Sequence, residues 1–205
     1  MAGVILTIMM GGSVMLMKRG RDLHRWAAVT GDLNSRAARG VSRINRTLLG
    51  CGFDALTPDL TTPAGADTVW SSTLDLQLGD DWDSDNDVVI WGNSTRIQLE
   101  LEPSEIDNGA DDDGDGLVDE HRVVLIRNFG AADEQQVVLV NGVSEFLEGE
   151  TFNGLDDNGN GMVDEEGLCF SLDGSVLSVQ LTLQRLGPDG STVTRTQGTT
   201  IGLRN

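Results

Sequence analysis

Two acidic segments of the chain have the residue types and the spacing of a metal-binding loop. Residues 108–120 (NGADDDGDGLVDE) and residues 153–165 (NGLDDNGNGMVDE) align without gaps at an offset of 45 residues and are identical at nine of 13 positions. Each contains the pattern D-x-[DN]-x-[DN]-G-x-V-D, which matches the first nine positions of an EF-hand-type calcium loop. Alternate side-chain oxygens can converge on one ion when the chain coils tightly. The pattern therefore predicts a site for a hard, oxygen-seeking cation.

The candidate ligands occupy equivalent positions in the two loops. In the first loop, residues 107–120, they are Asp111, Asp113, Asp115, the carbonyl group of Leu117, Asp119 and Glu120. In the second loop, residues 152–166, they are Asp156, Asn158, Asn160, the carbonyl group of Met162, Asp164 and Glu165. Glycine at position six of each loop permits the sharp turn that brings these oxygens together.

Both loops depart from the EF-hand at position 12, where a bidentate glutamate is expected. Arg122 and Gly167 stand there instead, and no convincing helix flanks either loop. Glu120 and Glu165, at position 10, can replace that ligand only if each loop leaves the ion by a different route. The segments are therefore interpreted as EF-hand-like loops that lie between strands.

We expect these loops to hold structural Ca²⁺, one or two ions per chain, because several carboxylates within a few ångströms repel one another unless a cation lies between them. The alternative for either loop is a solvated Asp/Gly turn. The first loop has carboxylates at positions 1, 3, 5 and 9, whereas the second has only two, so the first is predicted to bind more tightly. Residues 80–87 (DDWDSDND) also alternate acids but lack the glycine, which favours a solvated turn.

A long helix is predicted in front of the acidic region. Residues 1–17 contain no charged residue and are just long enough to cross a bilayer as a helix; a buried core helix is the alternative. From Leu23 to Leu48, apolar residues recur at steps of three and four, while most arginines lie off that stripe. Residues 1–49 thus predict one helix, membrane-anchoring and then amphipathic, that ends before Gly50-Cys51-Gly52.

The rest of the chain predicts a β-rich domain. Residues 53–67 are expected to form a linking loop, and strand patterns follow at 73–78, 88–91, 96–102, 122–127, 136–140, 168–172, 176–184 and 191–196. Apolar and polar residues alternate within these runs, as in an antiparallel sheet with one covered face. The predicted fold class is α+β, a long N-terminal helix packed on an antiparallel β-sheet, with domains at residues 1–50 and 51–205.

The charge distribution separates these two parts. Residues 1–50 carry eight basic and two acidic residues, whereas residues 51–205 carry six basic and 31 acidic residues, for a net charge of −19. An acidic domain cannot grip a phosphate backbone, so nucleic-acid binding is excluded. No nucleophile motif, zinc motif or nucleotide-binding loop is present, and an enzyme is not expected. Cys51 and Cys169 allow at most one disulfide, which the sequence leaves open.

The order of an apolar helix, an amphipathic continuation and a sheet that closes on a C-terminal strand resembles that of type IV pilin-like proteins. This family includes minor pilins and type II secretion pseudopilins. Residues 193–205, ending in Leu-Arg-Asn, are similar to the last strand of its larger members, and the acidic loops look like insertions in some prepilin-type proteins. The family's basic leader, cleavage site and assembly glutamate do not precede the apolar segment. A start at Met1 several residues into the mature helix would explain this.

The resemblance implies a structural subunit of a type IV pilus or a type II secretion pseudopilus. Its partners would be other pilin or pseudopilin subunits, contacted through the N-terminal helix, and the inner membrane. Residues 51–205 would then form a periplasmic or extracellular domain, although the Lys18–Arg21 cluster favours the opposite orientation by the positive-inside rule. The alternative function is a membrane-anchored, calcium-dependent surface adhesion module.

Overall fold

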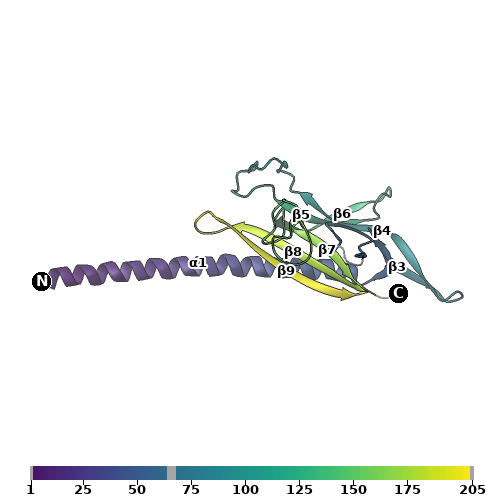
Figure 1. Cartoon of the computed structure of the whole chain (residues 1–205), viewed down its shortest axis with the longest axis horizontal. Coiled ribbons are helices and arrows are strands. Elements are labelled where there is room, and N and C mark those ends of the chain that lie inside the picture. Colours follow the sequence, from purple (N-terminus) through teal and green to yellow (C-terminus); the bar gives the residue numbers. More distant parts are fainter. Residues whose placement is uncertain (1, 64–67, 204–205) are drawn as a thin grey trace.

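The protein consists of one long helix and one large antiparallel sheet (Figure 1). The computed structural model describes residues 2–63 and 68–203, and their side chains except those of residues 2–14 and 54. The elements are α1 Ala2–Leu48, β1 Cys51–Thr57, β2 Trp70–Ser71, β3 Thr73–Asp83, β4 Val88–Leu101, β5 His121–Arg127, β6 Gln135–Val143, β7 Leu168–Asp173, β8 Val176–Leu186 and β9 Thr192–Gly202.

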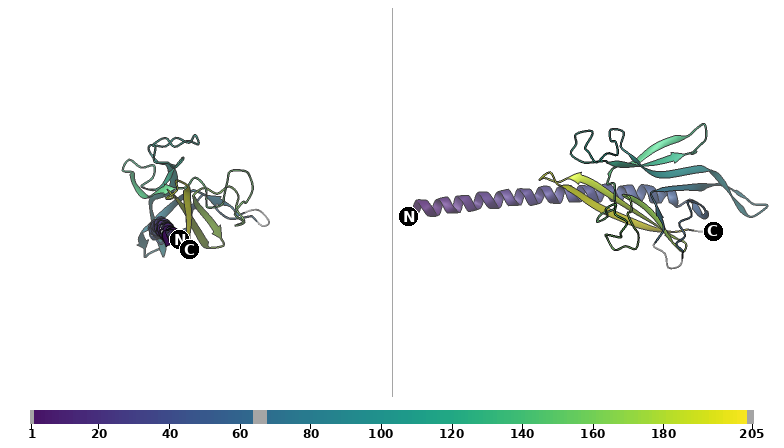
Figure 2. Two further views of the ribbon diagram at one scale, coloured as in Figure 1. Left: turned by 90° about the vertical axis from the view of Figure 1, so that its left-hand side faces the viewer. Right: turned by 45° about the horizontal axis from the view of Figure 1, so that its top comes forward.

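The sheet is organised around β8. Its strand order is β1-β3-β4-β5-β6-β8-β7-β2, and β9 pairs with β8 along the whole length of that strand. One edge of β8 is shared by two strands, because β7 pairs with residues 176–181 and β6 joins at Leu183. The sheet therefore divides at β8 and curls, as the view along the helix axis shows (Figure 2).

The predicted α+β, pilin-like fold is wrong. The protein is mostly β, with one N-terminal helix and a single curled sheet. Because the sheet curls, its own strands supply most of the buried side chains, including Leu74, Ile97 and Phe170. The helix lies mainly along β6, β8 and β9 and does not cover a flat layer.

The second half of α1 enters the core through one apolar stripe. Leu33, Ala37, Val41, Ile44 and Leu48 are buried and are spaced by three or four residues, which places them on one face of the helix. Gly40 lies on the same side, where an added Cβ would come within 2.8 Å of Leu181 Cδ2. Glycine at this position therefore permits the close approach of α1 to β8.

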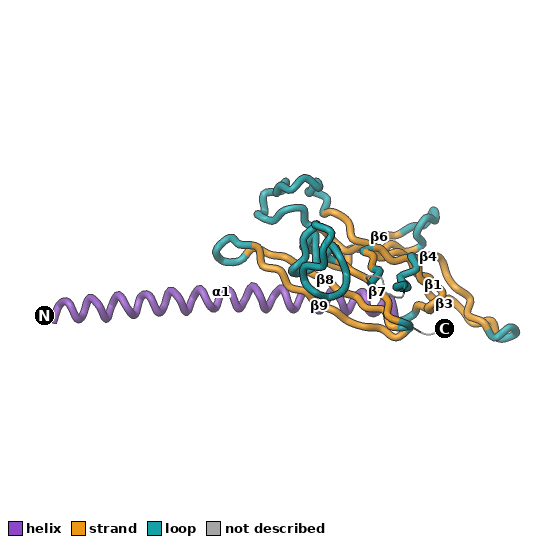
Figure 3. The backbone as a smooth tube through the Cα atoms, in the orientation of Figure 1, coloured by secondary structure: helices purple, strands orange, loops and turns teal. Residues whose placement is uncertain are grey.

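The first half of α1 projects beyond the sheet (Figures 1 and 3). The ring of Trp26 lies against Gly187 in the β8–β9 turn, and the residues before it extend away from that turn. Most of the predicted membrane segment, residues 1–17, consists of residues whose side chains the structure does not describe. Among the residues with described side chains, no helix is both long enough and apolar enough to cross a membrane.

Most predicted elements are confirmed, with several differences. The predicted strands 88–91 and 96–102 form the single strand β4, and the short strand β2 was not predicted. The predicted linking loop begins instead with β1, which pairs with β3 next to the C-terminal end of α1. The acidic segment 80–87 is only partly a turn, because β3 continues to Asp83 and β4 begins at Val88. This hairpin therefore extends further from the body of the sheet than its apolar pattern indicates. Arg204 and Asn205 of the predicted last strand lie outside the described residues.

The neighbouring residues Leu48 and Leu49 test how much the helix contributes to the fold. Leu48 is fully buried in the core, whereas Leu49 is 71% exposed. Leu48→Ala should lower the free energy of unfolding by about 2–4 kcal/mol, because it removes buried methyl groups and leaves a cavity. Leu49→Ala should change it by less than about 0.5 kcal/mol. Urea unfolding followed by circular dichroism measures both; equal effects would contradict the observed packing.

Candidate metal centres

The two acidic loops connect neighbouring strands and are built on the same plan. The first joins β4 to β5 and the second joins β6 to β7, and both lie outside the sheet (Figure 3). Each is bracketed by equivalent backbone hydrogen bonds at an offset of 45 residues. Glu102 N–H donates to the Glu120 carbonyl at 2.8 Å, and Leu147 N–H donates to the Glu165 carbonyl at 3.0 Å. The sheet thus closes the base of each loop in the same way.

The aspartate at position 1 organises the turn in each loop. Asp111 accepts the N–H groups of Gly114 and Gly116, at 2.6 and 2.9 Å. Asp156, its equivalent, accepts those of Gly159 and Gly161 at 2.6 and 2.8 Å. All four glycines have positive φ angles between 77° and 91°, which other residues rarely adopt. The loops therefore coil as the spacing of their aspartates predicts.

The aspartate at position 9 closes each loop onto its first residues. Asp119 accepts the N–H groups of Asn108 and Gly109, at 3.2 and 2.8 Å. Asp164 accepts those of Asn153 and Gly154, at 2.8 and 3.0 Å. Both aspartates adopt left-handed backbone angles, with φ of 49° and 53°. The aspartate at position 9 thus ties the end of each loop to the residues that precede position 1.

Two pairs of buried glutamates lie at the bases of the loops. Glu105 and Glu120 are 7% and 4% exposed, and Glu150 and Glu165 are 6% and 0% exposed. Neither carboxylate oxygen of Glu105, Glu120 or Glu165 has a hydrogen-bond partner within the described protein, and one oxygen of Glu150 is also unpartnered. A buried carboxylate without a partner is costly. These oxygens therefore favour a cation or a proton in both loops.

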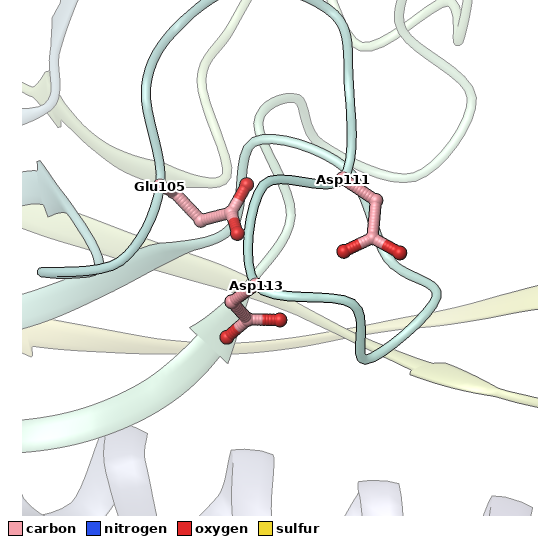
Figure 4. A group of neighbouring side chains, drawn as sticks. All are labelled: Glu105, Asp111 and Asp113. Atoms are coloured by element: carbon pink, nitrogen blue, oxygen red, sulfur yellow. The ribbon is translucent and has the colours of Figure 1, made fainter.

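The first loop brings three carboxylates together in space. Oxygens of Glu105, Asp111 and Asp113 lie within 4.8 Å of one another, and this acidic group could hold a metal ion. Figure 4 shows the three side chains near one another on the loop. A cavity of about 330 Å³ is lined by Glu105 and Asp113, by Asp115 and Glu120, and also by Arg36 and Arg185. The predicted ligands at positions 3 and 5 and the glutamate at position 10 thus border one region.

The second loop has the same frame with fewer charges. Asn158 and Asn160 replace the aspartates at positions 3 and 5, and the backbone N–H of Asn158 donates to Glu150 Oε1 at 2.8 Å. Glu165 lies at the base, while Asp156 is exposed at the rim. Leu117 and Met162, at position 7, bury their side chains in the two loops. Among the described residues, three carboxylates come within 4.8 Å of one another in the first loop only, and the second loop carries fewer negative charges.

Glu105 and Glu150 were not predicted as ligands. They lie six residues before position 1, outside the segment that an EF-hand comparison covers. The signal was present nevertheless, because the offset of 45 residues that aligns the two loops also pairs these glutamates.

Position 12 cannot supply a ligand in either loop because the chain has already re-entered the sheet. Arg122 lies in β5, and its Nη2 is 2.8 Å from Glu100 Oε1 on the neighbouring strand. An added Cβ at Gly167 would lie 1.8 Å from the Ser144 carbonyl oxygen, so no side chain fits there. The buried glutamates at position 10 are the buried carboxylates that lie nearest in sequence to position 12.

Burial also changes the protonation of these glutamates. Removal from water, with the nearby Asp115 and Glu105, raises the pKa of Glu120 from 4.5 to about 7. Burial and the proximity of Glu150 likewise raise the pKa of Glu165. Without a metal ion, the protein therefore retains protons in the loops at pH values where carboxyl groups in water are ionised.

The cysteines and His121 do not act as metal ligands in the sequence prediction, and the structure places them as follows. Cys51 and Cys169 are both free and buried in separate apolar clusters, so the structure has no disulfide between them. His121 follows the first loop, and its Nδ1 lies 2.8 Å from the Asp119 carbonyl oxygen, which makes Nδ1 the donor. No protein-family model, curated protein or solved structure matches this chain.

The buried glutamates predict an unusual pH dependence for the metal-free protein. In EDTA, the free energy of unfolding should decrease as the pH rises from about 4.5 to about 7. In this window the unfolded chain has already released the Glu120 proton, whereas the folded protein still binds it, so rising pH favours unfolding.

Urea unfolding at a series of pH values in EDTA measures this slope. Glu120→Gln should flatten it, because the amide does not titrate. Asp173→Asn, at an exposed acid at the end of β7, should leave it unchanged. An unaltered slope in Glu120→Gln would contradict the assignment.

Proposed function

We propose that this chain is a structural subunit of a type IV pilus or a type II secretion pseudopilus, with structural Ca²⁺ in its two inter-strand loops. The observation that supports assembly is the projecting half of α1. Met15, Leu16, Met17 and Leu23 are 61–76% exposed on a helix that no other described element covers there. Exposed apolar side chains in such a row favour burial against other helices or in a lipid bilayer.

In this proposal the helix is the assembly element and residues 51–205 are the displayed part. Helices from several copies would pack side by side through their first halves, and the segment 1–17 would insert into the inner membrane before assembly. The sheet would then lie on the periplasmic or extracellular side. Basic residues from Lys18 to Arg25 would lie beside the lipid headgroups or the acidic parts of neighbouring copies.

The calcium part of the proposal is supported by the unpartnered buried glutamates. In the first loop the ion would be held by oxygens of Glu105, Asp111, Asp113, Asp115 and Glu120, and in the second by those of Glu150, Asp156, Asn158, Asn160 and Glu165. When bound, the cation supplies the positive charge that the protein lacks at these positions. The loops would then be fixed in shape and resistant to proteolysis.

Calcium should therefore stabilise the folded protein at neutral pH. At free Ca²⁺ 100 times the dissociation constant, each site should add about 2.7 kcal/mol to the free energy of unfolding. Calorimetric titration of the full chain in detergent should show two sites, with the first loop the tighter. An unchanged melting temperature on adding EDTA to the Ca²⁺-loaded protein would contradict calcium binding.

Two matched variants assign the sites. Glu105→Gln should weaken only the tighter site and Glu150→Gln only the weaker one, each by about tenfold or more, because each removes a buried negative ligand. Asp173→Asn removes the same charge elsewhere and should weaken neither. Equal affinities of the two loops, or a loss at both sites from one variant, would overturn the assignment.

The projecting helix can be tested with two adjacent residues. Leu23 is 70% exposed, and His24 beside it is also exposed. Leu23→Glu should decrease association of the full chain, measured by sedimentation in detergent, without changing the melting temperature. His24→Glu should leave association nearly unchanged, because it removes no apolar contact area. Equal effects of the two variants would argue against helix packing.

A further inference from the structure

A basic cavity lies between α1 and β6, and one of its arginines, Arg36, also lines the acidic cavity beside the first loop. It has a volume of about 440 Å³, and its polar lining includes Arg36, Arg39 and Arg43. Arg36 Nη2 donates to the Asn141 carbonyl at 3.1 Å, and Arg43 Nη1 donates to the Leu139 carbonyl at 2.6 Å. These bonds fix two guanidinium groups on the outer side of β6. They leave further donors of both groups available.

The three arginines have no carboxylate partner in the described part of the molecule. The ion pairs there lie elsewhere, at Arg96, Arg122, Arg185 and Arg195. Like charges held close together repel, and an anionic group between them would relieve that repulsion. The wall of the cavity is partly apolar, since it includes Val138, which is 40% exposed. Its occupant should therefore be both acidic and apolar.

The end of the β3–β4 hairpin has this chemistry. Asp80, Asp81, Asp83, Asp85 and Asp87 lie within eight residues, and none of them pairs with a basic side chain of the described protein. Trp82 lies among these aspartates and Val88 follows the last of them, and they are 51% and 50% exposed. Hydrogen bonds from the Asn86 amide and from the backbone keep the pKa of Asp83 below its usual range, so this acid stays ionised. We call residues 80–88 the hairpin tip.

The hairpin tip and the cavity of one molecule cannot meet. The tip extends past the C-terminal end of α1, away from the half of the helix that projects at the opposite end (Figure 1). The cavity lies at residues 36–43, between these two ends. Complementary surfaces at different positions of one chain can be satisfied between copies, as a head-to-tail contact that repeats along an open assembly.

We propose that the hairpin tip of one copy docks into the arginine-lined cavity of the next copy, with its aspartates against Arg36, Arg39 and Arg43 and with Trp82 against β6. The contact deepens the proposed assembly function and rests on it, since the helices would hold neighbouring copies in parallel. Charge complementarity would set the register between copies, and burial of Trp82 would supply much of the affinity.

Site-specific cross-linking of the full chain in detergent tests the contact directly. Arg39 and Asp85 make no side-chain hydrogen bond in the described structure, so Arg39→Cys and Asp85→Cys should preserve the fold. The native thiols should not interfere, because Cys51 and Cys169 are buried and burial raises the pKa of Cys51 to about 11. A mixture of the two variants under mild oxidation should give a disulfide-linked dimer.

Two control mixtures make the result specific. The first control mixes Arg25→Cys with Asp85→Cys and so moves one thiol to another exposed position on the same helix. The second mixes Arg39→Cys with Asp173→Cys and so moves the other thiol to a different exposed turn. The test mixture should give about tenfold more linked dimer than either control, since a docked pair has a much higher effective concentration than a random encounter. Equal yields in all three mixtures would overturn the proposal.

A charge swap separates this contact from helix packing. Arg39→Asp and Asp85→Arg should each reduce association several-fold, and the double variant should recover it, because the reversed charges then meet between copies. Unlinked thiols together with association lost only in Leu23→Glu would leave helix packing intact and reject the hairpin contact. Cross-linked thiols together with unchanged association in Leu23→Glu would support the hairpin contact and reject helix packing. Loss of binding to phosphatidylglycerol vesicles in Arg39→Asp, without any cross-link, would assign the cavity to a lipid headgroup and also reject the proposal.

Discussion

The order of the two acidic loops depends on four buried carboxylates. Glu105 with Glu120, and Glu150 with Glu165, are nearly inaccessible to water, and most of their oxygens have no partner in the described protein. Ionised groups in such positions are destabilising unless a positive charge or a proton accompanies them. Among the described side chains, no lysine or arginine forms an ion pair with them. An external cation is the counter-charge that we propose for these oxygens, because carboxylate oxygens are the ligands that hard cations prefer.

This constraint extends into the sheet because the loops are anchored at strand ends. The carbonyl groups of Glu120 and Glu165 accept backbone hydrogen bonds from the strand or turn that precedes each loop. The second loop also begins and ends where β6 and β7 meet the same edge of β8, and Gly167 there lies against the Ser144 carbonyl. A change in the occupancy of the second loop would therefore act on the point where the sheet divides. Loop order and sheet curvature are physically connected at this junction.

Local sequence patterns predicted the helix, most strands and the two loops. They missed the fold class, which depends on non-local strand pairing, and two of the buried glutamates. The helix, most strands and the coiling of both loops follow from periodicity, glycine positions and the spacing of aspartates. The fold class was wrong because the sharing of one edge of β8 by two strands leaves no mark in any single segment. Glu105 and Glu150 were missed because an EF-hand template ends before them. The alignment of the two loops, continued for three more residues, would have identified both.

The arginine-lined cavity lies where the basic helix meets the acidic domain. Exposed charges are screened beyond about 8 Å at physiological ionic strength, so the basic helix and the acidic domain do not attract each other strongly at long range. At short range the arginines beside β6 and the aspartates of the hairpin tip need close contact to be neutralised. Such contacts select a register more than they supply affinity, which must come from buried apolar area such as Trp82 and the exposed first half of α1. An assembly built in this way would use helices for cohesion and charge for alignment, while the loops would keep the displayed domain rigid.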